Sequence, residues 1–201
     1  MELPSFFLEL SKLYKEHGFS LYLVGGTSRD MLLGNSPSDF DLTTDATVEE
    51  EKNFLPDFNS CFAKFGSIKL NFSSQEIDIT TFRKEGCYLD HRHPSSISFV
   101  KDMKIDSMRR DFTINAIYID DKGKIYDFYS GQSDLKNRVL RFIGDPNIRI
   151  QEDPLRILRA ERFARRLNFQ IEEKSLEAIN RNRDLLKLLN PNKVEMEMKK
   201  G

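Results

Sequence analysis

The stretch that decides the fold covers residues 21–45 and reads "LYLVGGTSRDMLLGNSPSDFDLTTD". An apolar segment stops at Gly25 and Gly26, and a short segment closed by another glycine follows. Acidic and apolar residues then alternate from Asp39 through Asp41. This order predicts a strand, a glycine turn, a short helix and a second strand that carries two carboxylates.

Working outward from this stretch, the chain divides into two parts of different character. Residues 1–145 mix strand-like and helical segments, and we expect an α/β head domain there. Residues 146–201 repeat apolar positions at helical spacing, which predicts a helical neck. Within the head, residues 109–120 ("RRDFTINAIYID") read as a strand, whereas residues 83–98 show no period and are expected to form a mobile loop.

Composition places the chain among ordinary globular proteins. It has 201 residues, of which 39% are hydrophobic and 31% charged, and no apolar run approaches the roughly 18 residues of a membrane span. The two cysteines, Cys61 and Cys87, form neither a disulfide framework nor a zinc motif, so we expect a cytoplasmic location and no membrane contact. The net charge of −1 does not indicate nucleic acid, although basic residues outnumber acidic ones after residue 145.

The acids of the opening stretch are candidates for binding metal. Asp39 and Asp41 lie two positions apart on a predicted strand, so their side chains leave the same face. Oxygen ligands in this arrangement suit two Mg²⁺ ions, and Asp78 in "EIDIT" offers a third acid on a neighbouring strand. Such a set supports phosphoryl transfer. The alternative is that strand acids are simply solvated, and the two acids alone do not decide between these interpretations.

The glycine turn favours the first interpretation. Gly25 and Gly26 between a strand and a helix would let backbone N–H groups approach a phosphate. Arg29 adds a cation near the start of the helix. Together with the acids 13 and 15 positions after Gly26, the turn predicts a site for a nucleotide.

Several motifs in a fixed order make this prediction more specific. The segments "LVGGTSRDMLLG", "DFDLTTDAT", "EIDITTFR", "DSMRRDFTINAI" and "EDPLRILRAERFA" resemble those of the family of class II tRNA nucleotidyltransferases (CCA-adding enzymes) and bacterial poly(A) polymerases. The resemblance implies a nucleotidyltransferase (polymerase β-like) head with a mixed sheet, followed by an all-helical neck. It implies addition of C and A to the 3′ end of tRNA from CTP and ATP without a template, with two Mg²⁺ ions and release of pyrophosphate. Asp39, Asp41 and Asp78 would be the catalytic acids.

The resemblance also implies which residues bind the nucleotide. Arg109, Arg110 and Asp111 would hold its ribose and phosphates, Asp153 and Arg156 its base. The full set is Gly25, Gly26, Arg29, Arg109, Arg110, Asp111, Asp153, Arg156, Arg159 and Arg162. From the residues alone, a surface salt bridge within 109–111 and an intrahelical ion pair between Asp153 and Arg156 remain open.

A carboxylate beside a guanidinium would explain a preference for both C and A. These bases present an amino donor next to a ring-nitrogen acceptor, whereas U and G present the reverse pattern. Asp153 and Arg156 would therefore pair with C or A and leave U or G with mismatched polar groups. In the family a flexible loop adjusts this pocket, and the matching loop here contains Asp90 and Arg92.

The same motifs leave other activities open. A poly(A) polymerase, an enzyme that adds only A to tRNA, and a head–neck fragment that binds nucleoside triphosphates without turnover share nearly all of them. Family members generally continue into helical body and tail domains, whereas this sequence stops at "MEMKKG". We therefore expect either a chain that lacks these domains or one that works with a partner chain to hold tRNA.

Overall fold

A computed structural model describes residues 2–88 and 94–199 of the protein. Its centre is a six-stranded sheet with the order β3-β4-β2-β1-β7-β8. The strands are β1 (Leu21–Leu23), β2 (Phe40–Thr44), β3 (Ser67–Phe72), β4 (Gln75–Thr81), β7 (Ile117–Ile119) and β8 (Ile125–Asp127). Strands β2 and β4 run parallel while the other neighbours run antiparallel, so the predicted mixed sheet is confirmed.

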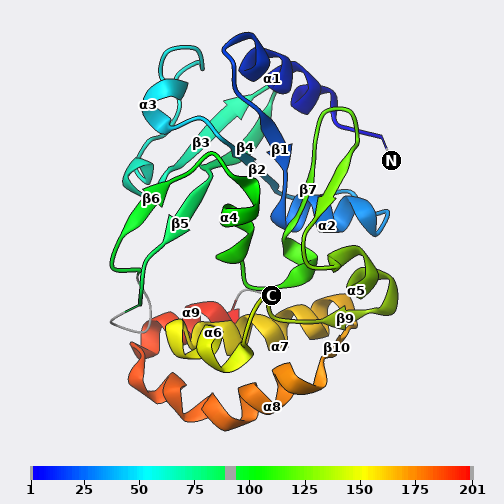
Figure 1. The fold of residues 1–201 in the computed structure, drawn as a ribbon, viewed down its shortest axis with the longest axis vertical. Helices are drawn as coiled ribbons and strands as arrows, with labels where there is room; N and C mark the ends of the chain where they lie inside the picture. The colour runs from blue at the N-terminus through cyan, green and yellow to red at the C-terminus, as the bar shows by residue number, and fades with distance from the viewer. Residues whose placement is uncertain (1, 89–93, 200–201) are drawn as a thin grey trace.

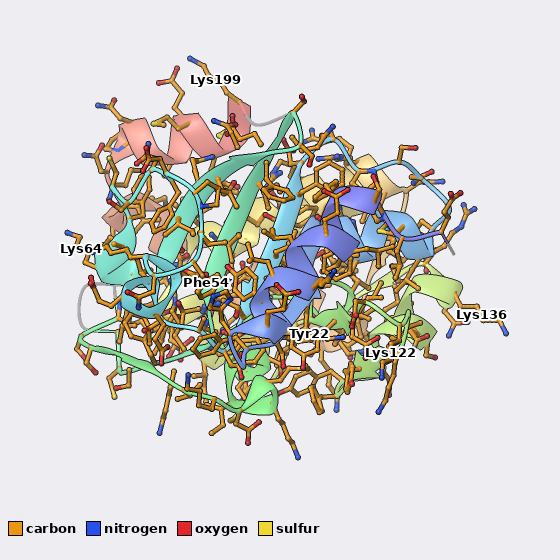
Figure 2. The ribbon with its side chains drawn as sticks, turned by 90° about the horizontal axis from the view of Figure 1, so that it is seen from above. Tyr22, Phe54, Lys64, Lys122, Lys136 and Lys199 are labelled. Atoms are coloured by element: carbon orange, nitrogen blue, oxygen red, sulfur yellow. The ribbon has the colours of Figure 1, made fainter. Side chains whose placement is uncertain are left out.

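The two faces of the sheet differ in chemistry. Helix α1 (Ser5–Glu16) lies across one face, where Phe7, Leu10 and Tyr14 pack with the apolar residues of β2, β3 and β4 (Figure 2). Because side chains alternate along a strand, the residues between these apolar positions point to the other face of the sheet. Asp41 and Asp78 therefore lie on the face opposite α1.

The remaining helices divide between head and neck. The head contains α2 (Gly25–Leu32), α3 (Val48–Glu51), α4 (Met103–Met108) and α5 (Gly131–Asn137). The neck contains α6 (Pro146–Glu152), α7 (Leu155–Leu167), α8 (Glu173–Asn182) and α9 (Pro191–Lys199), which gather at one end of the molecule (Figure 1). Thr47 and Glu50 form a capping box at the start of α3. No helix in the described ranges is both long and apolar enough to cross a membrane.

Head and neck share one hydrophobic cluster. Phe112 and Phe142 from the head pack with Ile150, Ile157 and Ala160 from the neck. This continuous core fixes the position of α7 relative to the sheet, and thereby the cleft between them.

The neck is not entirely helical, in contrast to the prediction. Strand β10 (Gln170–Ile171) pairs in parallel with β9 (Val139–Leu140) at the edge of the head. Asn168 takes a left-handed conformation with φ 54° at the end of α7, which turns the chain so that the next residues can pair.

Two further predictions for the head were wrong in detail. Residues 109–120 do not form one strand: Arg109 ends α4, a short 3-10 helix covers Thr113–Asn115, and β7 is the strand within this segment. The ends of the segment expected to be a loop form a hairpin of β5 (Arg83–Glu85) and β6 (Ile97–Phe99). Asp90 and Arg92 lie outside the described residues.

Candidate active site

The two acids of the opening stretch lie at the start of β2. Asp39 precedes the strand and is exposed, while Asp41 is its second residue and is half-buried. Burial raises the pKa of the Asp41 carboxyl, and the carboxylates of Asp78 and Asp39 add to this rise. A hydrogen bond from Gly26 and the charge of Arg110 act against it. Both acids line one cleft, as the spacing predicts.

The glycine turn is the first turn of helix α2 and packs directly on Asp41. The backbone N–H of Gly26 donates to Asp41 Oδ2 at 3.2 Å. Gly25 has φ 65°, and a Cβ there would lie 2.9 Å from the same oxygen, so a side chain does not fit. Thr27 ties helix to strand, because its Oγ1 accepts from the Asp41 N–H at 2.7 Å and donates to the Asp39 carbonyl at 3.1 Å. The start of α2 is thus fixed beside both acids.

Asp78 lies beside Asp41, but its side chain has another partner. The parallel pairing of β2 and β4 places the two residues opposite each other. Lys69 on β3 forms an ion pair with Asp78 at 3.1 Å, and Asp78 is not among the residues that line the cleft. The structure thus brings the third acid to the neighbouring strand, and its catalytic role stays a prediction.

The cleft lies between the sheet and the neck and has a volume of about 760 Å³. Arginine is the commonest residue type in its lining. The lining also includes Asp39, Asp41, several aromatic rings and the first residues of α2. All ten residues expected to bind the nucleotide line it: Gly25, Gly26, Arg29, Arg109, Arg110, Asp111, Asp153, Arg156, Arg159 and Arg162. Tertiary structure therefore gathers residues that are more than 130 positions apart in the sequence into one site.

Arg109 and Arg110 are held by a carboxylate that the sequence analysis missed. Asp106 is fully buried and accepts from Arg109 Nε at 2.8 Å, from Arg110 Nη2 at 3.2 Å and from the hydroxyl of Tyr118 at 2.8 Å. Burial alone raises the pKa of Asp106, but the charges of both arginines outweigh it and lower the pKa. The i, i+3 and i+4 spacing from Asp106 is the signal that could have revealed this group.

The expected pair of Asp153 and Arg156 is divided between other partners. Arg156 Nε donates to Asp111 Oδ1 at 2.6 Å, and its Nη1 donates to Glu152 at 2.8 Å. Asp153 accepts from Arg159 Nη2 at 2.7 Å, while Arg159 Nε lies 2.9 Å from Asp111 Oδ2. We call these residues, Asp111, Glu152, Asp153, Arg156 and Arg159, the acid–arginine network.

The charge of this network is largely balanced. Burial would raise the pKa of Asp111, but Arg159 and Arg156 outweigh this effect, and the pKa is lowered. The side chains of Arg156 and Asp153 are almost fully buried, so their positions are set by these pairs. Sequence spacing suggested an intrahelical pair, whereas the fold brings in Asp111 from 45 positions earlier.

Two cleft arginines are also in contact with one aromatic ring. The guanidinium carbons of Arg29 and Arg162 lie 5.3 and 4.6 Å from the centre of the Phe163 ring. Arg29 donates to Asn115 at 3.0 Å, and Arg162 to Glu197 of helix α9 at 2.9 Å. Phe163 and Glu197 were not expected here, and local periodicity holds no signal for a contact between α7 and α9.

The donor set of the two acids fits Mg²⁺. Asp39 and Asp41 offer carboxylate oxygens beside an arginine-lined cleft, and Mg²⁺ prefers few protein carboxylates, with water and substrate phosphates as the other ligands. The described residues contain no cluster of three or more potential ligand side chains. A metal bound by two carboxylates and the phosphates of a nucleotide is consistent with that observation.

Comparison with known proteins places the chain in a family. Residues 21–141, more than half of the sequence, match the model of the poly A polymerase head domain. The chain belongs to this family. Its motifs and its mixed α/β fold are those that the resemblance implied.

Related proteins carry more specific names. The chain is 39% identical to the CCA-adding enzyme of Lactobacillus helveticus over 99% of its own length and 51% of the relative's. It is 40% identical to the CCA-adding enzyme of Staphylococcus epidermidis over 94% and 47% of the two chains. The chain therefore spans about half the length of the curated relatives it matches.

Solved structures agree with this placement. The CCA-adding enzyme of Bacillus stearothermophilus in complex with CTP superposes with a TM-score of 0.88 at 33% identity, covering 98% of this chain and 48% of the other. A tRNA nucleotidyltransferase complexed with a primer tRNA and an incoming ATP analog gives a TM-score of 0.73 at 30% identity, covering 94% and 55%. The head and neck of this chain therefore have the fold of nucleotidyltransferases of this family.

Proposed function

We propose that this chain is the catalytic head and neck of an enzyme that adds C and A nucleotides to the 3′ end of tRNA, building the CCA end from CTP and ATP without a template. The observation that carries the proposal is the single cleft, which combines two strand acids, a helix start and six of the expected arginines. The names of the relatives support tRNA, CTP and ATP as its partners. A cytoplasmic location stays a prediction.

The triphosphate would lie at the start of α2. The glycine turn presents backbone N–H groups there, and Arg29, Arg109 and Arg110 add positive charge within the same cleft. Because Asp106 fixes the last two guanidinium groups before substrate arrives, they can balance the charge that develops on the leaving pyrophosphate without reorganising.

Asp39 and Asp41 would hold the two Mg²⁺ ions. When bound, these ions lower the pKa of the attacking 3′-hydroxyl and neutralise the leaving group. Burial raises the pKa of Asp41 although the Gly26 N–H and the charge of Arg110 lower it, so a bound cation would stabilise the charged form of this carboxyl. A cation is the natural partner for such a group.

Base selection would use Asp153 and Arg156. Their side chains are fixed on neighbouring turns by Arg159 and Asp111, and both face the cleft. A carboxylate accepts from the amino group of C or A, and a guanidinium donates to the ring nitrogen beside it. U and G would set acceptor against acceptor, which a buried site discriminates strongly.

An incorporation assay tests the proposal. The protein is incubated with Mg²⁺ and tRNA that lacks CCA, first with labelled CTP and then with ATP; we expect two C residues and one A, with no use of UTP or GTP. Addition of A to tRNA ending in CC without any use of CTP would instead identify an A-adding enzyme. Failure to incorporate either nucleotide on both tRNA ends would overturn the proposal.

A further inference from the structure

The walls of the cleft differ in chemistry. Near β1 and helix α7 the wall is rich in arginines and their carboxylate partners. On the β3 side it carries Phe62 and Phe65, followed by Ser67 at the start of the strand. In the sheet, β4 and β2 separate β3 from β1, so the acids of β2 lie between the glycine turn and the aromatic wall.

Phe62 exposes its aromatic ring at the start of a turn whose position is fixed by neighbouring residues. It is 55% exposed although it lines the cleft. The turn that follows is pinned by Arg83, whose Nη1 donates to the carbonyl of Phe65 at 2.5 Å. Gly66 has φ 74°, and its carbonyl accepts from the Thr81 N–H at 2.7 Å, which fixes the turn against β4. Lys64 extends from the same turn at the outer edge of the molecule (Figure 2).

The geometry of the proposed reaction assigns a substrate to this wall. In phosphoryl transfer the attacking and leaving oxygens lie roughly in line. If the glycine turn and the arginines hold the phosphates near β1, the attacking hydroxyl must come from the opposite direction, across Asp41 from the β4–β3 side. The last nucleoside of the acceptor then lies against Phe62.

The changing sequence of the acceptor end also favours recognition of its last base by stacking on an aromatic ring. The 3′-terminal base of the acceptor changes as the end grows, and a hydrogen-bonding pocket would reject some of these ends. An aromatic ring accepts every base, because each has a π-face, and stacking contributes about 1–3 kcal/mol per base. We propose that Phe62 stacks on the 3′-terminal base of the single-stranded acceptor RNA. This inference rests on the proposed function.

A fluorescence titration tests the contact without any turnover. The protein has no tryptophan, so F62W carries a single indole on the cleft wall. Short single-stranded RNAs ending in CC are added without nucleotide, and we expect saturable quenching. RNAs ending in A or U should give apparent affinities within about threefold, because stacking is sequence-tolerant. An RNA whose last nucleotide is abasic should quench several-fold less.

F128W is the matched control. Phe128 is also an exposed phenylalanine, at 38%, but it is not among the described residues that line the cleft. Its substitute should not respond to RNA. Absence of quenching in F62W at millimolar RNA, equal quenching by the abasic RNA, or equal quenching in F128W would overturn the inference.

Acceptor kinetics provide a second test. We expect F62A to raise the KM for acceptor RNA by roughly 5- to 100-fold and to leave the KM for CTP unchanged, with F62Y close to wild type. An unchanged acceptor KM in F62A overturns the inference while the proposed function stands. Failure of the wild-type chain to extend any acceptor counts against the proposed function, and the titration still decides the stacking contact.

Discussion

The strand acids and the acid–arginine network are built from the same residue type in opposite ways. Asp39 and Asp41 come from one short segment, and their hydrogen bonds come from neutral donors such as Ser38 and the Gly26 N–H. Asp111 lies between α4 and β7 and forms ion pairs with Arg156 and Arg159 of the neck helix α7. The charge of the strand acids is therefore available to a ligand, whereas arginines of the protein neutralise the charge of Asp111.

The pKa shifts record this difference. Burial raises the pKa of Asp41, whereas at Asp111 the neighbouring arginines overcome burial and lower the pKa. A carboxylate without an ion pair among the described residues is suited to binding metal, and a carboxylate between two guanidinium groups is suited to fixing them. Burial alone therefore does not distinguish a carboxylate suited to binding metal from one that holds arginines; the charge of its partners does.

The largest effect should come from the strand acids. Asp41→Asn removes a charged metal ligand while keeping its shape, and we expect nucleotide incorporation to fall by about 10³-fold or more. Nucleotide binding should stay measurable, because the arginines are untouched. Asp184→Asn, at an exposed aspartate paired with Lys187, is the control and should keep full activity. Comparable activity in both variants would contradict the assignment of Asp41.

The network should respond in stability as well as in activity. Asp111→Asn leaves Arg156 and Arg159 without their shared carboxylate, and we expect unfolding to become easier by about 3 kcal/mol. The exposed Asp39→Asn should change this free energy by less than about 0.5 kcal/mol. Denaturant unfolding of the two variants measures the difference. Equal free energies of unfolding in the two variants would contradict the distinction between the strand acids and the acid–arginine network.

Base selection should depend on one member of the network. Asp153→Ala removes the acceptor for the amino group of C, and we expect the preference for CTP over UTP in kcat/KM to fall by at least about tenfold. The total rate with CTP should fall less than in Asp41→Asn. Glu161→Ala, which alters a partly exposed acid on helix α7, is the control. Unchanged selectivity would mean that Asp153 serves only to position Arg159.

Glu51, which is not among the residues that line the cleft, tests the same rule about partners. Glu51 is buried, accepts from the hydroxyl of Tyr14 at 2.5 Å, and its pKa is raised to about 8, first of all by burial. The unfolded chain loses this proton near 4.5, so the contribution of Glu51 to stability is complete below that pH and declines as pH rises towards 8.

A pH series measures this contribution. The wild-type free energy of unfolding should decline by up to about 1.4 kcal/mol per pH unit across this window because of Glu51. Glu51→Gln, which keeps the shape without a titrating proton, should flatten the decline. A wild-type slope that persists in the variant would show that other groups cause it.

The acids and the glycine turn could be predicted because their signals are local. Alternation places Asp39 and Asp41 on one face, and a strand followed by two glycines predicts the start of a helix. The arginines of 109–111 were expected on a strand, and the structure places them after α4 instead. Their role in the cleft could still be inferred from the motif, because it does not depend on the secondary structure around it.

What the sequence determined by itself was therefore the set of residues: the acids, the glycine turn and the arginines of the neck. Only the tertiary structure decided their partners. It paired Arg156 with Asp111, buried Asp106 under two arginines and set Phe62 on the wall opposite the glycine turn. The physical reason is that hydrophobic periodicity reports neighbours within one helix or strand. Pairing between distant residues depends on how the neck docks against the head through their shared core.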